Sequence, residues 1–204
     1  MLKLIKYHLK RKLSPKYTYL EKFSIRSGNT VIDLGANIGE VTEYFARRKA
    51  TVYAYEPNPY AFKVLLKNWG ASPHVKLYNS AVSNYTGHSN LWLHVDHSKS
   101  EVEFSQASSL QAEKSNVSKD AVQVDVIDIA DVLAQHKHIR LLKVDIEGGE
   151  YDIIDEIIKN IAKIDFVLLE THAHKHKAFE QKEHELQEKI QDSGSKQKFF
   201  TDWF

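Results

Sequence analysis

The stretch VIDLGANIGE, at residues 31–40, restricts the possible fold more than any other part of the chain. It opens with a short apolar run, typical of a buried strand, which Asp33 closes. Gly35 and Gly39 then flank a tight loop, and the apolar residues that follow recur with helical spacing. A strand, a glycine loop and a helix in this order bring free backbone N–H groups and the positive end of a helix together. This arrangement suits an anionic part of a ligand.

Segments of the same two kinds alternate along the rest of the chain. Short β-branched or apolar runs predict strands, and segments with apolar residues on one helical face predict helices. The predicted strands span 30–35, 50–58, 75–83, 121–127, 139–148, 165–170 and 198–204. The predicted helices span 40–48, 62–70, 128–135, 153–161 and 177–191. The sequence therefore predicts an α/β fold, with a doubly wound, mostly parallel sheet and helices on both faces. Ligands of such sheets bind beyond the carboxyl ends of the strands.

Length and composition favour a single domain. The chain has 204 residues, enough for one α/β domain with a full core and few for two. We expect this domain to span 27–204, with an insertion at about 84–120 that is rich in Ser, Asn, His and Lys. Alternating apolar residues in the insertion predict a β-hairpin followed by a loop.

Residues 1–26 differ from the remainder in charge, since they carry eight Lys or Arg residues against Glu21 alone. Their apolar residues Leu2, Ile5, Leu9 and Leu13 share one helical face, which predicts a basic amphipathic helix or extension. Two interpretations stay open. The helix packs over the edge of the sheet with solvated lysines, or it makes a weak contact with an anionic membrane surface or nucleic acid.

Several classes of protein are disfavoured by what the sequence does not contain. It has no cysteine, which excludes disulfides, thiolate catalysis and cysteine-bound zinc. No apolar run is long enough for a transmembrane helix or the core of a signal peptide. We therefore expect a cytoplasmic protein.

Glu56 narrows the choice of ligand. It ends the second predicted strand, 23 residues after Asp33, where a carboxylate accepts hydrogen bonds from two ribose hydroxyls. A nicotinamide dinucleotide and S-adenosylmethionine both carry a ribose whose hydroxyls could bind a carboxylate in this way. Dinucleotide sites, however, favour a second glycine where this chain has Asn37, whose side chain obstructs the pyrophosphate. S-adenosylmethionine is the better fit, with Asp33 available to its ammonium group directly or through water.

A second group of acids follows the strand in LLKVDIEGGE. Asp145, Glu147 and Glu150 leave the end of this strand, and acids there need a positive partner to offset desolvation. A sulfonium, an ammonium group or a metal ion would serve. For Glu150 we favour a simpler role, as the first residue of the next helix, where an acid complements the helix dipole.

Five motifs in this order resemble one known family. VIDLGANIGEVT, YAYEPNP, NSAVSNYTG, ASSL and LLKVDIEGGEYDII are together similar to the FkbM family of S-adenosylmethionine-dependent methyltransferases, over about residues 28–172. The resemblance implies the class I methyltransferase (Rossmann-like) fold and methylation of a hydroxyl on a sugar, glycan or small natural product. By position it implies that Glu56 holds the ribose and that Asp145 faces the reacting end. The other cofactor-binding residues that it implies are Asp33, Gly35, Asn37 and Gly39 at the aminoacyl end, and Ser80 and Ala81 beside the adenine.

The chain departs from class I methyltransferases at its C-terminal end. Only 34 residues follow Glu170, which suffice for a helix and one strand. We therefore expect a shortened sheet, without the usual seventh strand or with another segment in its place.

A hydroxyl acceptor requires a base, and His172 is the first candidate because imidazole titrates near neutral pH. Asp145 is the second candidate. His172, His174 and His176 also suggest a metal site, since alternate residues of a strand share a face. Lysines interrupt this run, and we predict no metal.

The residues that follow the fourth main strand help to distinguish between possible methyl acceptors. Enzymes that methylate a nucleobase amine place Asn/Asp-Pro-Pro-aromatic there, whereas this chain has Asp145-Ile-Glu-Gly. Nucleic acid is therefore an unlikely partner, although ribose 2′-O-methylation of RNA stays open. A non-catalytic nucleotide-binding or scaffold module on the same fold is the alternative from another class.

Overall fold

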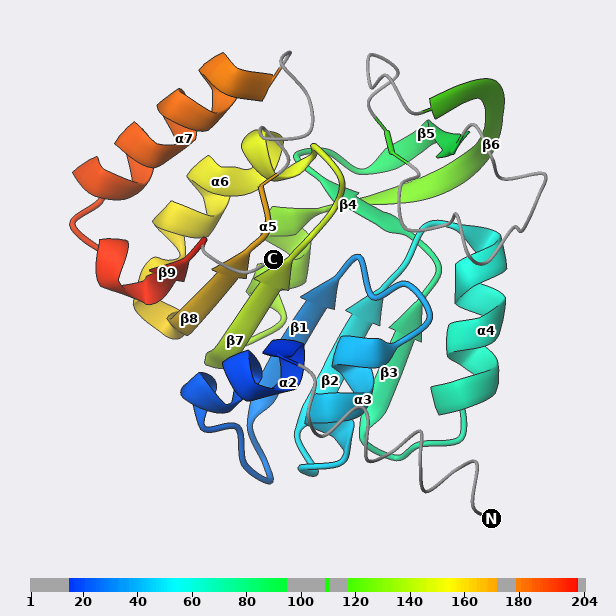
Figure 1. Ribbon diagram of the computed structural model, residues 1–204, viewed down its shortest axis with the longest axis horizontal. Helices are drawn as coiled ribbons and strands as arrows, with labels where there is room; N and C mark the ends of the chain where they lie inside the picture. Colours follow the sequence, from blue (N-terminus) through cyan, green and yellow to red (C-terminus); the bar gives the residue numbers. More distant parts are fainter. Residues whose placement is uncertain (1–14, 95–108, 111–116, 172–178, 202–204) are drawn as a thin grey trace.

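The computed structural model describes residues 15–94, 109–110, 117–171 and 179–201 (Figure 1). The predicted apolar face at Leu2–Leu13 and the candidate base His172 lie outside these residues, as do His174 and His176.

A six-stranded sheet forms the centre of the molecule, and every pair of neighbouring strands in it is parallel. Its strands are β1 (Thr30–Leu34), β2 (Thr51–Tyr55), β3 (Val75–Tyr78), β7 (Ile139–Val144), β8 (Ile164–Leu169) and β9 (Phe199–Phe200). The order is β3-β2-β1-β7-β8-β9, so the chain reverses direction across the sheet between β1 and β7. This confirms the predicted doubly wound fold and places the ligand crevice at the carboxyl ends of β1 and β7.

A smaller sheet comes from the predicted insertion and the strand beside it. Its strands are β4 (Ala81–Ser83), β5 (Gly87–His94) and β6 (Val117–Asp128), in the order β4-β6-β5. β5 and β6 pair antiparallel. The hairpin predicted within 84–120 is not tested, because its second alternating stretch, 101–105, lies outside the described residues. The single strand predicted over 75–83 is wrong, because the chain turns at Asn79 and Ser80 and divides the segment between the two sheets. The small sheet lies beyond the arrowheads of the central strands (Figure 1).

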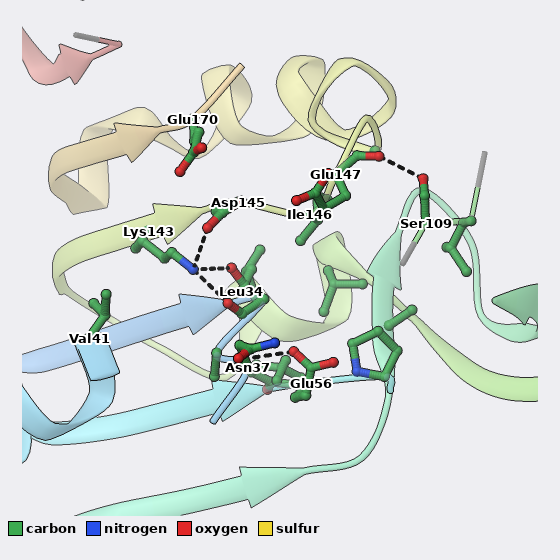
Figure 2. A pocket seen from close by; sticks show the side chains of 18 of the residues that line it. Leu34, Asn37, Val41, Glu56, Ser109, Lys143, Asp145, Ile146, Glu147 and Glu170 are labelled. Atoms are coloured by element: carbon green, nitrogen blue, oxygen red, sulfur yellow. Dashed lines mark hydrogen bonds and ion pairs between the residues drawn. The ribbon is translucent and has the colours of Figure 1, made fainter. Parts of the chain in front are cut away.

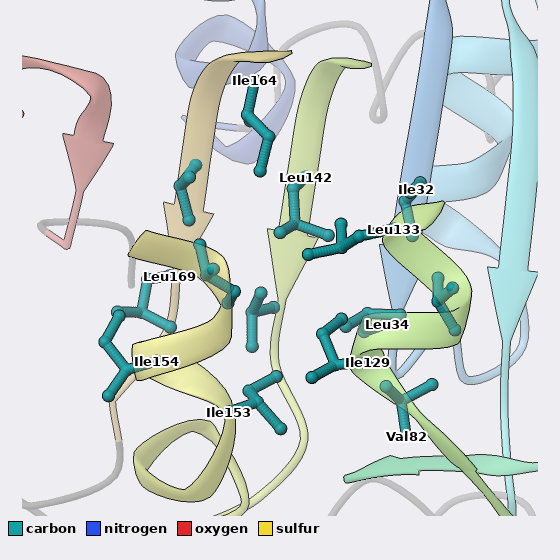
Figure 3. Close-up of a cluster of buried hydrophobic side chains, with 14 of the residues drawn as sticks. Ile32, Leu34, Val82, Ile129, Leu133, Leu142, Ile153, Ile154, Ile164 and Leu169 are labelled. Carbon is teal, nitrogen blue, oxygen red and sulfur yellow. The ribbon is translucent and has the colours of Figure 1, made fainter. Parts of the chain in front are cut away.

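Helices cover both faces of the central sheet. On one face are α5 (Ile129–Ala134), α6 (Glu150–Lys159) and α7 (Glu180–Asp192), and on the other are α2 (Pro15–Leu20), α3 (Glu40–Ala46) and α4 (Pro59–Trp69). β1 shows why both faces are covered, since Ile32 and Leu34 pack on the α6 face and Val31 packs on the α3 face. Figure 3 shows the cluster of buried apolar side chains that contains Ile32 and Leu34, which lies between α5, α6 and the sheet. Each large apolar side chain buried there contributes about 1.5–3 kcal/mol.

The described part of the N-terminal segment belongs to the core. Leu20 and Phe23, from α2 and the 3-10 turn η1 (Glu21–Phe23), are fully buried. The ring of Phe23 packs edge-on against Phe200, with 5.0 Å between centroids, and lies 5.4 Å from Phe166. Arg140 donates to the carbonyl oxygen of Phe23 at 2.9 Å. These contacts fasten the segment to β8 and β9.

The C-terminal end of the sheet is short. The 3-10 turn η3 (Ile161–Lys163) leads into β8, and the 3-10 turn η6 (Lys196–Lys198) leads into the two-residue strand β9. β9 pairs directly with β8. Within the described ranges no strand lies between them, in agreement with the expected shortening. None of the described helices has the length and apolarity needed to cross a bilayer.

Candidate cofactor-binding site

A cavity of about 230 Å³ lies where the central strands end, and Ala81, Val82 and Leu91 of the small sheet contribute to its wall (Figure 2). The predicted strands over 50–58 and 139–148 are too long, because the chain leaves the sheet after Tyr55 and Val144. The residues freed in this way form much of the wall. Charged and polar groups on the wall are Lys16, Asn37, Glu40, Glu56, Ser80, Ser109, Lys143, Asp145, Glu147 and Glu170.

The loop after β1 approaches the end of β7 very closely. Gly35 has a φ of +74°, and a Cβ atom there would overlap the carbonyl oxygen of Asp145. Only glycine fits both conditions at once. Asn37 and Gly39 also have positive φ values, +49° and +93°. The sequence thus places its glycine at the position where two strand ends meet.

Four backbone N–H groups of this loop bond within the protein. Gly35 and Ala36 both donate to the carbonyl oxygen of Tyr55 at 3.0 Å, and Gly39 donates to Ala36 at 2.9 Å. Asn37 donates to Oε2 of Glu56 at 2.8 Å. The sequence predicts that the N–H groups of this loop are free to bind a ligand. For these four groups the prediction is wrong, because each donates a hydrogen bond to another group of the protein. The bonds fasten the loop to the end of β2 instead.

Glu56 is 5% exposed and lies in the cavity wall. Its Oε1 accepts from the N–H of Asn58 at 2.8 Å, in addition to the bond from Asn37 (Figure 2). Burial raises the pKa of Glu56 to about 7, and the two backbone N–H groups and the charge on Lys143 oppose the rise in part. Asn58 is itself held as the cap of α4, where its side chain accepts from Tyr60 at 2.9 Å.

Lys143 is 2% exposed and lies at the centre of a buried ionic cluster. Its Nζ donates to the carbonyl oxygens of Gly35 at 2.7 Å and Leu34 at 3.1 Å. It also pairs with Oδ1 of Asp33 at 3.2 Å and Oδ2 of Asp145 at 3.4 Å. Burial alone would lower the pKa of Lys143, but the carboxylates of Asp145 and Asp33 outweigh it and raise the pKa above its ordinary value. The lysine therefore stays charged and joins β1 to β7.

Two predicted site residues lie behind the wall of the cavity. Asp33 is 0% exposed, and its second oxygen accepts from Oγ1 of Thr42 at 2.7 Å. It supports the site through Lys143 and is not among the lining residues. Gly39 is also absent from the lining, and a Cβ atom there would meet the side chains of Leu65 and Trp69.

Ser80 and Ala81 line the cavity at the turn between the two sheets. The Ser80 side chain is 4% exposed, and its Oγ has no hydrogen-bond partner among the residues that the structure describes. A buried hydroxyl without a partner is costly, so this atom fits a ligand with a polar ring edge. Glu56 and Ser80 are thus polar groups of two different elements on one wall.

Three acids gather where β7 and β8 end. Asp145, whose side chain is 22% exposed, and Glu147 follow β7, and Glu170 follows β8. Ser109 Oγ donates to the carbonyl oxygen of Glu147 at 2.6 Å, and Glu147 has a φ of +56°. Such a backbone is strained outside glycine and concentrates at functional sites. Among the described residues, no three His, Cys, Asp or Glu side chains are arranged so that they could hold a metal ion.

Glu150 begins α6, as predicted, and accepts from the N–H of Gly148 at 2.9 Å. Lys143, Ser109, Glu170 and Lys16 also line the cavity, although none of them is predicted from the sequence as a site residue. A signal was present for Lys143, the one charge inside the apolar run LLKV. For Lys16 the sequence gives no such signal, because its place in the wall depends on how α2 packs.

The chain is similar in sequence to known methyltransferases. A model of the methyltransferase FkbM domain matches residues 33–196. The chain is 32% identical over 148 residues to Methyltransferase 1 of Beauveria bassiana (strain ARSEF 2860), which covers 61% of this chain and 56% of that protein. The chain thus spans little more than half the length of this relative.

Solved structures with partial similarity include P. horikoshii TYW2 in complex with MeSAdo, 28% identical over 34% of this chain and 29% of that chain, with a TM-score of 0.30. A SAM-dependent O-methyltransferase from Thermotoga maritima is 16% identical, with 88% of this chain and 50% of that chain covered and a TM-score of 0.42.

Proposed function

The chain belongs to the FkbM methyltransferase family, and from this premise we propose that it transfers a methyl group from S-adenosylmethionine to a hydroxyl of a sugar, glycan or small natural product. One observation carries the proposal: the Glu56 carboxylate and the Ser80 hydroxyl line one cavity at the switch point of the sheet, and the hydroxyl has no partner in the described part of the chain. Ligands of doubly wound sheets bind at this position.

The polar groups of the wall fit an adenosyl cofactor. Glu56 would accept hydrogen bonds from the ribose hydroxyls, because each of its oxygens accepts one hydrogen bond from the described backbone and has a second lone pair. Ser80, with Ala81 beside it, would face the adenine. When bound, the cofactor supplies an electrophilic methyl group on a positively charged sulfur.

The residues at the ends of β7 and β8 would serve the acceptor. Lys143 holds one oxygen of Asp145, which fixes the carboxylate at the edge of the cavity. Alignment of two reacting groups supplies roughly 7–11 kcal/mol in favourable cases. A carboxylate at this edge, Asp145 or Glu170, would receive the proton of the hydroxyl. His172 follows Glu170 by two residues and stays a candidate base.

Binding measurements test the cofactor assignment. Isothermal titration with S-adenosylmethionine, S-adenosylhomocysteine and NAD should show binding of the first two only. Glu56→Ala should weaken both by at least about tenfold, since it removes a charge-assisted hydrogen bond. Glu185→Ala, an exposed position on α7, serves as the matched control and should change neither. Binding of NAD alone would indicate an oxidoreductase, and no binding would indicate a scaffold.

Label transfer tests the acceptor. The protein is incubated with methyl-labelled S-adenosylmethionine and separate preparations of sugars, glycans and RNA. A labelled sugar or glycan product that survives mild alkali is expected, because a methyl ether resists base and a methyl ester does not. Label found in RNA would instead favour ribose 2′-O-methylation.

A further inference from the structure

The motif ASSL ends in Ser109 and Leu110, and both of these residues line the cavity. Ser109 is 1% exposed, and its backbone pairs with that of Trp92 in β5. Its N–H donates to the carbonyl oxygen of Trp92 at 3.0 Å, and its carbonyl oxygen accepts from the N–H of Trp92 at 2.8 Å. These two bonds fasten Ser109 to the small sheet and fix the direction of its side chain.

The hydroxyl of Ser109 reaches a different part of the fold. It donates to the carbonyl oxygen of Glu147 at 2.6 Å, across 38 positions of the sequence (Figure 2). Glu147 belongs to the turn after β7, residues 145–149, from which Asp145, Ile146 and Glu147 line the cavity. The hydrogen bond therefore joins the small sheet to the cavity wall at the end of β7.

The turn after β7 has a backbone conformation that requires support. Glu147 has a φ of +56° and Gly148 a φ of +105°, so two successive residues are left-handed. A residue with a Cβ atom keeps this conformation only where the surrounding structure holds it. On one side of Glu147, the N–H of Gly148 donates to Oε2 of Glu150 at 2.9 Å. The Ser109 hydroxyl holds the carbonyl group of Glu147 itself.

Asp145 is held by other contacts. Its N–H donates to the carbonyl oxygen of Leu34 at 3.2 Å, and its carboxylate pairs with Lys143. Loss of the Ser109 hydroxyl should consequently leave Asp145 in place and release the part of the turn that follows it. That part contributes Ile146 and Glu147 to the wall.

We propose that Ser109 is a positioning residue of the acceptor site, because its hydroxyl holds the Glu147 carbonyl and thereby keeps the turn after β7 in its left-handed conformation. In this account Ser109 touches neither the cofactor nor the reacting atoms and acts through Glu147. The inference rests on the proposed function, since it takes the residues at the end of β7 to serve the acceptor. A misplacement of about 1 Å at such a wall costs up to about a hundredfold in rate.

Amide hydrogen exchange measures the hold on the turn directly. Ser109→Val and Ser109→Thr form a matched pair, because the two side chains have the same shape and only threonine carries the hydroxyl. The N–H groups of Gly148 and Gly149 should exchange about tenfold faster in Ser109→Val than in Ser109→Thr, which is the value of one hydrogen bond. A difference below twofold would overturn the inference. An equal acceleration throughout β8 would also overturn it, because Ser109 would then stabilise the whole fold and not this turn.

Ser193→Ala provides the control. Its Oγ also donates to a carbonyl oxygen, that of Ile190 at 2.7 Å, but it lies at the end of α7 and outside the cavity lining. Loss of this bond should leave the exchange of Gly148 and Gly149 unchanged. Acceleration at the turn in this variant would show that the effect is not specific to Ser109 and would count against the inference.

Kinetics test the role in the site, with the sugar or glycan preparation that takes up label from S-adenosylmethionine. The kcat/KM for this acceptor should be at least about tenfold lower in Ser109→Val than in Ser109→Thr, while the KM for S-adenosylmethionine stays within about twofold. Equal losses for acceptor and cofactor would assign Ser109 a purely structural role and overturn the inference. If no preparation takes up label, the proposed function fails, and the exchange rates still decide whether Ser109 holds the turn.

Discussion

Acidification should weaken nucleoside binding through Glu56. Burial raises the pKa of this side chain to about 7, and the N–H groups of Asn58 and Asn37 keep it from rising further. An ionised carboxylate accepts hydrogen bonds from ribose hydroxyls at both oxygens, whereas the protonated acid gives up acceptor capacity to its own O–H. We therefore expect the nucleoside to bind the ionised form, and the sign follows: affinity is full above the pKa and is lost as the pH falls through it.

The magnitude follows from the population of the ionised form. If only that form binds, the dissociation constant is multiplied by one plus the ratio of protonated to ionised Glu56. This factor rises from about 1.1 at about pH 8 to about 11 at about pH 6, a loss of about 1.4 kcal/mol in binding free energy. Adenosine is the suitable ligand, because it has no group that titrates in this range.

Isothermal titration of adenosine across this range measures the effect. No histidine belongs to the described lining of the cavity, so Glu56 should dominate the profile. Glu56→Gln keeps the shape of the side chain without its ionisation and should bind weakly at every pH. A wild-type dissociation constant that stays within twofold between the two pH values would refute the reasoning. So would an equal pH dependence in Glu56→Gln, because another group would then be responsible.

Three further substitutions test the framework of the site. Gly35→Ala should destabilise the fold by at least about 3 kcal/mol in urea unfolding, because the new Cβ atom meets Asp145 and the φ is positive. Unchanged stability would contradict the observed approach of β1 and β7. Lys143→Met should cost about 3–5 kcal/mol by leaving the buried carboxylates without a cation, and added Asp33→Asn should recover part of this loss. An unfolding midpoint equal to that of the wild type would contradict the stabilising role of the ionic cluster. Asp145→Asn should reduce turnover of an identified acceptor more than cofactor affinity, and wild-type turnover would remove its assignment.

The order of elements was predictable from local patterns. The sequences of β7 and β8 are near-continuous apolar runs because both faces of these strands are buried. Isoleucines on one helical face predict α6. Gly35 was predictable as well, since a glycine between a strand and a helix indicates a tight turn. Periodicity and turn chemistry depend on neighbours in the sequence, and these neighbours are known before folding.

The pairing partners of some strands could not be predicted from local patterns. The segment 75–83 has one continuous β pattern, yet its two halves pair with β2 and β6 in different sheets. Nothing in the segment itself states which partner each half takes. The prediction of one strand failed because pairing is decided by the position of other strands.

Local patterns in the sequence are enough to predict which types of group this site contains: a glycine loop, an acid after the second strand and acids after the fourth main strand. Their functions depended on the tertiary structure. Asp33 is predicted as a ligand contact, but the fold buries it against Lys143 and Thr42. Lys16 reaches the cavity from a helix that the chain leaves well before the glycine loop. The physical reason is that hydrogen bonds, ion pairs and desolvation act over a few ångströms, and only the packed chain decides which distant residues come that close.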